Sequence, residues 1–187
     1  MPLNLPNILT MLRVAAIPVL VVLFYLKHPL GTWGAAGIFC LAAVTDWFDG
    51  WLARRSGQST AFGAFLDPVA DKLIVATALI LLSDRFDDLI ITLSACVVIG
   101  REIVVSALRE WMAQLGRHAS VKVNQVAKVK TAMQMLAIFM LLLTLPGEGY
   151  RLWYWLAEGI LILAVVLTLW SMLVYLKAFM EVVRETD

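Results

Sequence analysis

Apolar residues occur in long runs that are separated by short polar breaks. A helix that crosses a bilayer needs about 20 mostly apolar residues. Six runs approach or exceed this length, at approximately 8–26, 33–51, 62–82, 89–111, 131–145 and 152–176, and the fifth can begin as early as Val123. The breaks between them contain turn-forming or charged residues, such as Pro29 with Gly31, or the segment 83–88. We therefore expect an all-α integral membrane protein with six transmembrane helices, in which residues 1–187 form a single domain.

Composition supports a membrane protein. The chain is 61% hydrophobic and only 16% charged, whereas a soluble domain is nearer half apolar and a quarter charged. The net charge of +1 gives no reason to expect a nucleic-acid partner. Cys40 and Cys96 lie inside apolar runs, without a CxxC neighbour, and are interpreted as small packing residues. The first residues lack the features of a cleaved signal peptide, so we expect the first apolar run to be retained.

The distribution of Lys and Arg predicts the orientation. With the N-terminus inside, only Lys27, Arg85 and Arg151 of the 15 Lys and Arg residues fall on the outer side. Positive residues gather on the cytoplasmic side of membrane proteins. This bias predicts that the active face is cytoplasmic. Gly31, Gly34 and the following Gly37 are expected to allow close approach of a neighbouring helix.

Four aspartates lie in the second and third runs, where a lipid-facing helix would not tolerate them. Asp46 and Asp49 are three residues apart, and Asp67 and Asp71 are four apart, so each pair shares one helix face. The polar segment 55–62 between them is short, which predicts an antiparallel helical hairpin. The four carboxylates would then converge near the inner membrane surface.

Four carboxylates in a confined site repel one another unless cations compensate them. Hard oxygen ligands suit Mg²⁺, Mn²⁺ or Ca²⁺ better than zinc or copper. Two such ions can stabilise the attacking and the leaving oxygens of a phosphoryl displacement. Gly50 and Gly63 would permit close approach of a substrate, and Arg54 could hold a phosphate with its bidentate fork.

Buried salt bridges are the structural alternative. Asp46 or Asp49 could pair with Arg54, and Asp71 could pair with Lys72. Pairing would still leave an excess of negative charge, because four carboxylates face two adjacent cations. Ionisable residues inside transmembrane segments are also expensive, which favours a functional role.

The hairpin resembles the signature of the CDP-alcohol phosphotransferase family, D-x-x-D-G-x-x-A-R, eight residues, G-x-x-x-D-x-x-x-D. All eight fixed positions are present over 26 residues, and they are Asp46, Asp49, Gly50, Ala53, Arg54, Gly63, Asp67 and Asp71. The resemblance implies the CDP-alcohol phosphotransferase fold, with six transmembrane helices, and a homodimer. It also implies a membrane-embedded catalytic domain that uses two divalent ions, Mg²⁺ or Mn²⁺, and CDP-diacylglycerol.

The resemblance further implies roles for individual residues. Asp46, Asp49, Asp67 and Asp71 would bind the metals, and Asp71 would also act as the general base. Gly50, Arg54 and Thr60 would contact the CDP moiety. The acceptor hydroxyl would lose its proton and attack the phosphorus that carries the lipid, and CMP would leave.

Several other segments are similar to a bacterial branch of the family that uses sn-glycerol 3-phosphate and forms phosphatidylglycerol phosphate. These segments are 4–13, 45–55, 101–103 with 106–111, and 128–131 with Gln134. The resemblance then implies a multi-pass enzyme of the bacterial inner membrane. Thr10 and Arg13 would line the CDP-diacylglycerol site, although Asn7 and Thr10 could equally form an ordinary helix start.

A dianionic acceptor needs additional cations. Arg101, Arg109 and Lys128 are predicted to bind glycerol 3-phosphate, with Lys130 as a further cation at the same end. Arg101 is the strongest candidate because it lies among apolar residues, and Glu102 is its alternative partner. A surface charge attracted to anionic lipid is the alternative for Arg109, Arg117, Lys122 and Lys130.

Three rival functions are compatible with parts of the sequence. The same chemistry could use inositol phosphate, serine or phosphatidylglycerol as acceptor. A small cation transporter could use the aspartates as ion ligands, although no inverted repeat is visible in the sequence. A membrane scaffold without catalysis would leave the aspartates unexplained.

Overall fold

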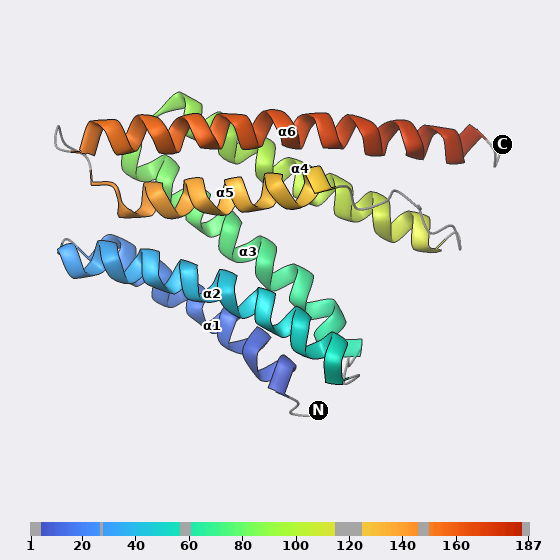
Figure 1. The fold of residues 1–187 in the computed structure, drawn as a ribbon, viewed down its shortest axis with the longest axis horizontal. Coiled ribbons are helices and arrows are strands. Elements are labelled where there is room, and N and C mark those ends of the chain that lie inside the picture. The colour runs from blue at the N-terminus through green and yellow to red at the C-terminus, as the bar shows by residue number, and fades with distance from the viewer. Residues whose placement is uncertain (1–4, 27, 57–60, 115–124, 146–149, 185–187) are drawn as a thin grey trace.

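The computed structural model describes residues 5–26, 28–56, 61–114, 125–145 and 150–184. These residues form six α-helices (Figure 1), which are α1 Leu5–Tyr25, α2 Pro29–Ser56, α3 Ala61–Phe86, α4 Leu89–Gln114, α5 Gln125–Leu143 and α6 Arg151–Arg184. The prediction of an all-helical chain is confirmed for this part of the protein. Each helix contains most of one predicted apolar run.

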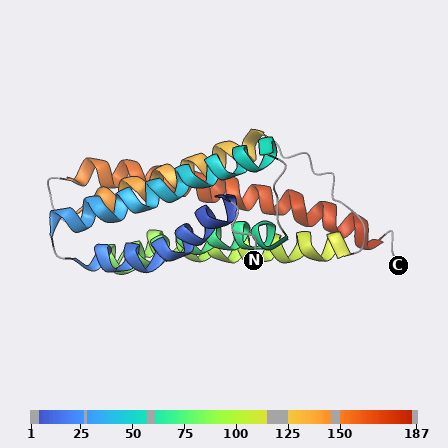
Figure 2. The same ribbon diagram turned by 90° about the horizontal axis from the view of Figure 1, so that it is seen from below.

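The helices form two layers, and in Figure 2 α6 crosses from one layer to the other. Figure 2 shows α1, α3 and α4 along one side and α2 and α5 along the other, with α6 packed on α5 and α4. Contacts between the layers run from α1 to α2, and from α3 to both α2 and α5. In Figure 1, α1 begins and α6 ends on the right, which is also where α2 ends and α3 begins. We call this the inner end, and the opposite end, where α1 ends and α4 begins, the outer end.

Two prolines lie inside helices. Helix α1 continues through Pro18, and α3 continues through Pro68. Proline is tolerated in membrane helices because neighbouring groups satisfy the backbone atoms that it leaves without a partner.

The core is formed by aliphatic residues from all six helices. Leu20, Leu79, Ile91 and Leu161 have no exposed surface, and Ile138 of α5 lies among them. Many large apolar side chains face outward instead, such as those of Leu30, Phe65, Leu89, Leu152 and Trp153. An outer surface of this kind suits lipid better than water.

Three of the described helices are long and apolar enough to cross a membrane. They are Asn7–Tyr25, Leu89–Ala113 and Arg151–Lys177. This supports membrane association. The inner halves of α2 and α3 contain charged side chains, including Asp46 and Asp67, which lower their apolar character.

Close packing explains Gly31 and Gly34 in α2. A Cβ at Gly31 would lie 2.6 Å from the carbonyl oxygen of Leu23, and one at Gly34 would lie 3.2 Å from the Leu23 side chain. These two glycines allow the end of α1 to approach α2, as predicted. Gly37 has nothing within 4 Å of its added Cβ, so the prediction is wrong there for the described residues.

The cysteines also differ from the prediction. Cys40 and Cys96 are free and exposed on the helix surfaces, so they do not pack inside the monomer. Both cysteines lie on helices whose outer faces are apolar.

Polar side chains at the outer end bond mainly to helix ends. Arg85 donates to the carbonyl oxygens of Leu142 and Phe24, and its guanidinium lies 3.7 Å from the centre of the Phe24 ring. Asp88 Oδ1 accepts from the backbone amide of Ile90 at 2.6 Å and so caps the start of α4. Its Oδ2 accepts from the Tyr154 hydroxyl at 2.8 Å, which ties α6 to this turn.

Candidate active site

Two of the predicted metal ligands are bonded to α1 at the inner end. Arg13 Nη1 donates to Asp46 Oδ1 at 2.9 Å, which joins α1 to α2. Thr10 Oγ1 donates to Asp67 Oδ1 at 2.5 Å, which joins α1 to α3. Thr10 and Arg13 lie three residues apart on one face of α1, so both side chains reach the hairpin. A helix outside the motif therefore contacts both halves of it.

These contacts have a buried side and an open side. Thr10 and Arg13 are only 1% and 2% exposed, whereas the Asp46 side chain is 46% exposed. The Arg13 guanidinium is buried at low dielectric, where a charge needs a partner, and Asp46 supplies one. The carboxylate still has an accessible side that a cation or substrate could reach.

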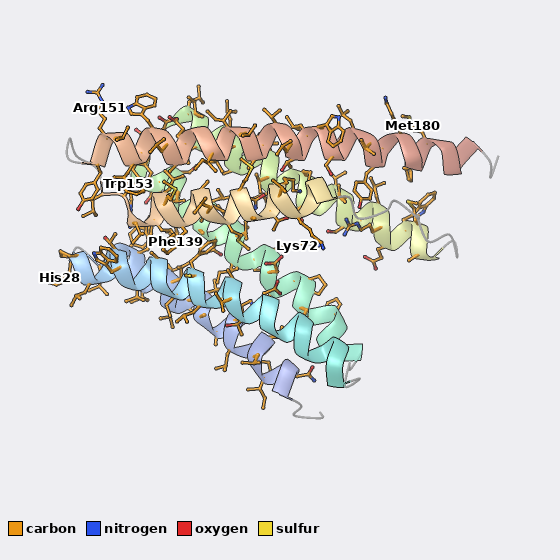
Figure 3. The ribbon with its side chains drawn as sticks, viewed as in Figure 1. His28, Lys72, Phe139, Arg151, Trp153 and Met180 are labelled. Atoms are coloured by element: carbon orange, nitrogen blue, oxygen red, sulfur yellow. The ribbon has the colours of Figure 1, made fainter. Side chains whose placement is uncertain are left out.

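Asp71 lies one turn beyond Asp67 on α3. It is partly buried and lies within electrostatic range of Asp46, Arg13, Glu102 and Lys72. The Lys72 ammonium donates to Ser106 Oγ on α4, and Figure 3 shows this side chain projecting from α3. Adjacent residues on a helix point in different directions. The Lys72 ammonium therefore reaches α4, and its hydrogen bond is to Ser106 and not to Asp71.

The remaining predicted residues of the hairpin lie outside the described side chains. These are Asp49, Gly50, Arg54 and Thr60. The salt-bridge alternative with Arg54 lies outside the described side chains as well, and Asp46 pairs with Arg13. Gly63 is buried in the first turn of α3.

The donor set fits a hard divalent cation. Asp46, Asp67 and Asp71 present carboxylate oxygens from two adjacent helices, and such oxygens are the ligands that Mg²⁺ and Mn²⁺ prefer. Among the side chains that the structure describes, no three His, Cys, Asp or Glu residues gather closely enough to hold an ion. The four-aspartate metal site thus remains a prediction.

A cluster of cations lies beside the carboxylates, between α4, α5 and α6. Arg101 Nη1 contacts Glu102 Oε1 at 2.5 Å, and Lys130 Nζ lies 4.0 Å from the same oxygen. Arg101 Nη2 also donates to Ser171 Oγ on α6 at 3.4 Å. Arg101 and Lys130 are 8% and 3% exposed. We call Arg101, Glu102 and Lys130 the cation cluster.

The cation cluster holds more positive than negative charge. Lys130 lies within electrostatic range of Arg101, Glu102 and Arg109. In the described part of the chain, Arg101 Nε is buried without a hydrogen-bond partner. Because one glutamate faces two buried cations, positive charge is left that a further anion could compensate.

The family can now be identified. A family model described as CDP-alcohol phosphatidyltransferase matches residues 3–170. The chain belongs to this family. The resemblance drawn from the motif in residues 46–71 is confirmed, and the match extends over the helices that carry the cation cluster.

Relatives within the CDP-alcohol phosphatidyltransferase family cover almost the whole chain. A Pseudomonas fluorescens protein is 54% identical over 176 residues, which are 94% of this chain and 89% of the relative. Proteins of Salmonella choleraesuis and Escherichia coli strain K12 are each 51% identical over 182 residues, which are 95% of this chain and 96% of each relative. All three are named CDP-diacylglycerol--glycerol-3-phosphate 3-phosphatidyltransferase.

In this phosphatidyltransferase, the residues predicted to bind the acceptor lie in three different environments. Arg101 is buried in the cation cluster, and Glu102 is its partner, as the alternative anticipated. Arg109 is exposed and donates to the Tyr175 hydroxyl at 2.8 Å. Lys128 is exposed near the start of α5. Lys130 is buried, so the surface-charge alternative is wrong for that residue.

Sequence reasoning missed Ser106 as a link to α3. Ser106 accepts from Lys72 and donates to the Glu102 carbonyl oxygen at 2.6 Å. The spacing of Glu102, Ser106 and Arg109 is i, i+4, i+7, which places them on one face of α4. That polar stripe was a signal available in the sequence.

Proposed function

We propose that this chain transfers the phosphatidyl group of CDP-diacylglycerol to sn-glycerol 3-phosphate, giving phosphatidylglycerol phosphate and CMP. One observation carries the proposal. The carboxylates of the family motif lie beside a buried cation cluster, because Lys72, which follows Asp71 on α3, donates to Ser106, one turn from Glu102 on α4. The two clusters suit the two substrates, and the names of the relatives point to the same pair.

The carboxylates serve the donor. Asp46, Asp49, Asp67 and Asp71 would hold two divalent ions, Mg²⁺ or Mn²⁺, with Gly50, Arg54 and Thr60 against the CDP moiety. When bound, the ions would offset the charge that develops on the diphosphate oxygens. This assignment is supported by the oxygen-only donor set and by the accessible side of Asp46.

The cation cluster serves the acceptor. Arg101 and Lys130 are buried and share a single glutamate, so a phosphate dianion between them would satisfy charge that the protein leaves uncompensated. Arg109 and Lys128 lie nearer the surface and would attract the acceptor on its way in. The glycerol hydroxyl would then point from the cluster toward Asp71.

Asp71 acts as the general base. It accepts the proton of the acceptor hydroxyl, whose oxygen attacks the phosphorus that carries the diacylglycerol. A new phosphorus–oxygen bond forms, the bond to the CMP oxygen breaks, and CMP leaves. A positioned base of this kind contributes about 10²- to 10⁴-fold to a rate.

The proposed location follows from the helices and the charges. All six helices cross the bacterial inner membrane with the inner end toward the cytoplasm, since 19 residues, the length of the shortest helix α5, still span about 28 Å. The four longer helices, α2, α3, α4 and α6, have 26 to 34 residues and would extend beyond the lipid at the inner end. A homodimer is proposed from the family resemblance.

The decisive experiment measures CMP release by the purified protein in detergent with CDP-diacylglycerol and Mg²⁺ or Mn²⁺. Glycerol 3-phosphate, inositol phosphate, serine and phosphatidylglycerol are supplied as parallel acceptors, and EDTA is the control for the metal. We expect release with glycerol 3-phosphate alone and its loss in EDTA.

The other outcomes would each remove a different part of the proposal. Release with another acceptor would retain the chemistry and overturn the substrate. Release that survives EDTA would overturn the metal site. Metal flux in proteoliposomes without any CMP release would favour the transporter alternative.

A further inference from the structure

Helix α1 contributes no residue to the eight-position motif, yet it contacts both halves of the motif hairpin. Thr10 donates to Asp67 at 2.5 Å and Arg13 donates to Asp46 at 2.9 Å. The pairs are separated by 57 and 33 residues along the chain. Each contact engages Oδ1, and the second oxygen of each carboxylate takes no part in it.

The burial of these two α1 residues needs an explanation. An arginine inside a membrane helix is costly, and Arg13 is 2% exposed. Thr10 is 1% exposed and directs its hydroxyl to a carboxylate on another helix. Thr10 lies in the second turn of α1 and not at its start. Its hydroxyl links two helices, whereas the equally buried hydroxyl of Thr144 at the outer end donates to the carbonyl oxygen of Met140, four residues earlier in the chain.

We propose that Thr10 and Arg13 are positioning residues that hold Asp67 and Asp46 in the geometry required for divalent-cation binding. The inference rests on the proposed metal role of these aspartates. Metal-ligating carboxylates are usually held by hydrogen bonds from residues outside the ligand set, and loss of such a partner typically costs 10- to 100-fold in metal affinity. The two residues therefore act on the metal, and not only on CDP-diacylglycerol as expected from the sequence.

The test measures Mn²⁺ affinity of the full chain in detergent, by electron paramagnetic resonance of free Mn²⁺, without CDP-diacylglycerol. Thr10→Val keeps the shape of the side chain and removes the hydroxyl. We expect it to weaken Mn²⁺ binding by about 10- to 100-fold. A residue that served only the donor would leave Mn²⁺ affinity unchanged in the absence of donor.

Matched variants separate the hydroxyl from general destabilisation. Thr144→Val makes the same change at a site that is 2% exposed but at the opposite end, and it should bind Mn²⁺ like the wild type. Thr10→Ser keeps the hydroxyl and should also bind normally. If Thr10→Val fails to fold, Thr10→Ser and Thr10→Ala are compared instead, and equal affinity of these two would overturn the role of Thr10.

The sign of the effect decides the role of Arg13. Removal of a cation beside the carboxylates would by itself tighten Mn²⁺ binding, because repulsion falls. Loss of positioning would weaken it. We expect weaker binding for Arg13→Gln, with partial recovery in Arg13→Lys, and unchanged or tighter binding would overturn the proposal for Arg13.

Failure of the inference and failure of the proposed function give different results. If the wild type binds no Mn²⁺, the metal role of Asp46 and Asp67 is overturned, and the positioning role is overturned with it. If the wild type binds Mn²⁺ and the α1 variants bind it equally well, only the positioning role is overturned.

Discussion

The inner and outer ends of the bundle use the same residue types in different ways. At the outer end, Arg85 bonds to two helix-end carbonyl oxygens, and Asp88 bonds to the amide that starts α4 and to Tyr154. At the inner end, Asp46 and Asp67 accept from side chains of another helix. The outer charges bond to backbone groups at helix ends and to a tyrosine hydroxyl, whereas the inner carboxylates bond to a buried arginine and a buried threonine of α1.

This difference distinguishes structural from functional charges. A charged side chain that hydrogen-bonds to backbone groups is already stabilised by the folded chain and needs no ligand. The inner carboxylates have an exposed side and the inner cations outnumber their glutamate, so both clusters can still accept a ligand. Substitutions at the two ends should therefore alter different measurable quantities, turnover at the inner end and stability at the outer end.

The largest effect is expected from Asp71→Asn. It should lower CMP release by about 10²- to 10⁴-fold, because the general base is lost, while the unfolding temperature in detergent stays close to that of the wild type. Asp88→Asn is the matched control, since it changes the same residue type at the outer end and should leave turnover intact. Normal turnover by folded Asp71→Asn protein would remove Asp71 from the chemistry.

A smaller effect is expected at the cation cluster. Arg101→Ala and Lys130→Met should each raise the KM for glycerol 3-phosphate by about 10-fold or more, since a charge-assisted hydrogen bond to phosphate contributes about 1.5–3 kcal/mol. The KM for CDP-diacylglycerol should change little. Steady-state kinetics with each substrate varied in turn provide the measurement. Equal increases in both KM values would contradict the division between donor and acceptor clusters.

Gly31→Ala examines the packing of the outer end. The new methyl group would lie 2.6–2.8 Å from the carbonyl oxygens of Leu23 and Leu26 and from the Cβ of Leu26, so we expect destabilisation of about 1–3 kcal/mol. Gly37→Ala, on the same helix with open space around it, is the control and should be nearly neutral. Thermal unfolding in detergent compares them. A larger loss in Gly37→Ala would show that the α1–α2 approach does not explain these glycines.

The smallest effect concerns pH and Asp88. The hydrogen bond from Tyr154, with the amides of Ile90 and Ile91, lowers the pKa of Asp88 although burial opposes this. A lowered pKa in the folded state stabilises the fold above the unfolded value of about 3.9, and this contribution is lost as the pH falls through the folded pKa. The difference in unfolding temperature between wild type and Asp88→Asn should therefore be constant near neutral pH and shrink in acid. A difference that grows in acid would contradict this sign.

Local spacing was enough to predict much of the fold and of the carboxylate site. Six apolar runs predicted six helices because a spanning segment must satisfy its backbone internally. The motif lies within 26 residues, so the face shared by Asp67 and Asp71 follows from helical periodicity alone. Glu102 was recognised as a partner of Arg101 because the two residues are adjacent in the sequence.

Long-range contacts were not predictable in this way. Nothing local distinguishes Lys128 from Lys130, yet the packing of α5 against its neighbours exposes one and buries the other. Lys72 could pair with Asp71 by sequence, but the side chain reaches across to Ser106 on α4. The burial of a lysine and its hydrogen-bond partner both depend on which faces of neighbouring helices pack together.

The sequence by itself determined the family, the membrane class and the residues of the carboxylate hairpin, because these depend on composition and on spacing within one or two helices. Only the tertiary structure decided that Thr10 and Arg13 contact Asp67 and Asp46, and that Arg101 and Lys130 share Glu102. The physical reason is that a side-chain contact between helices depends on the direction and rotation of both helices. Packing of the whole bundle fixes these, and no single segment specifies them.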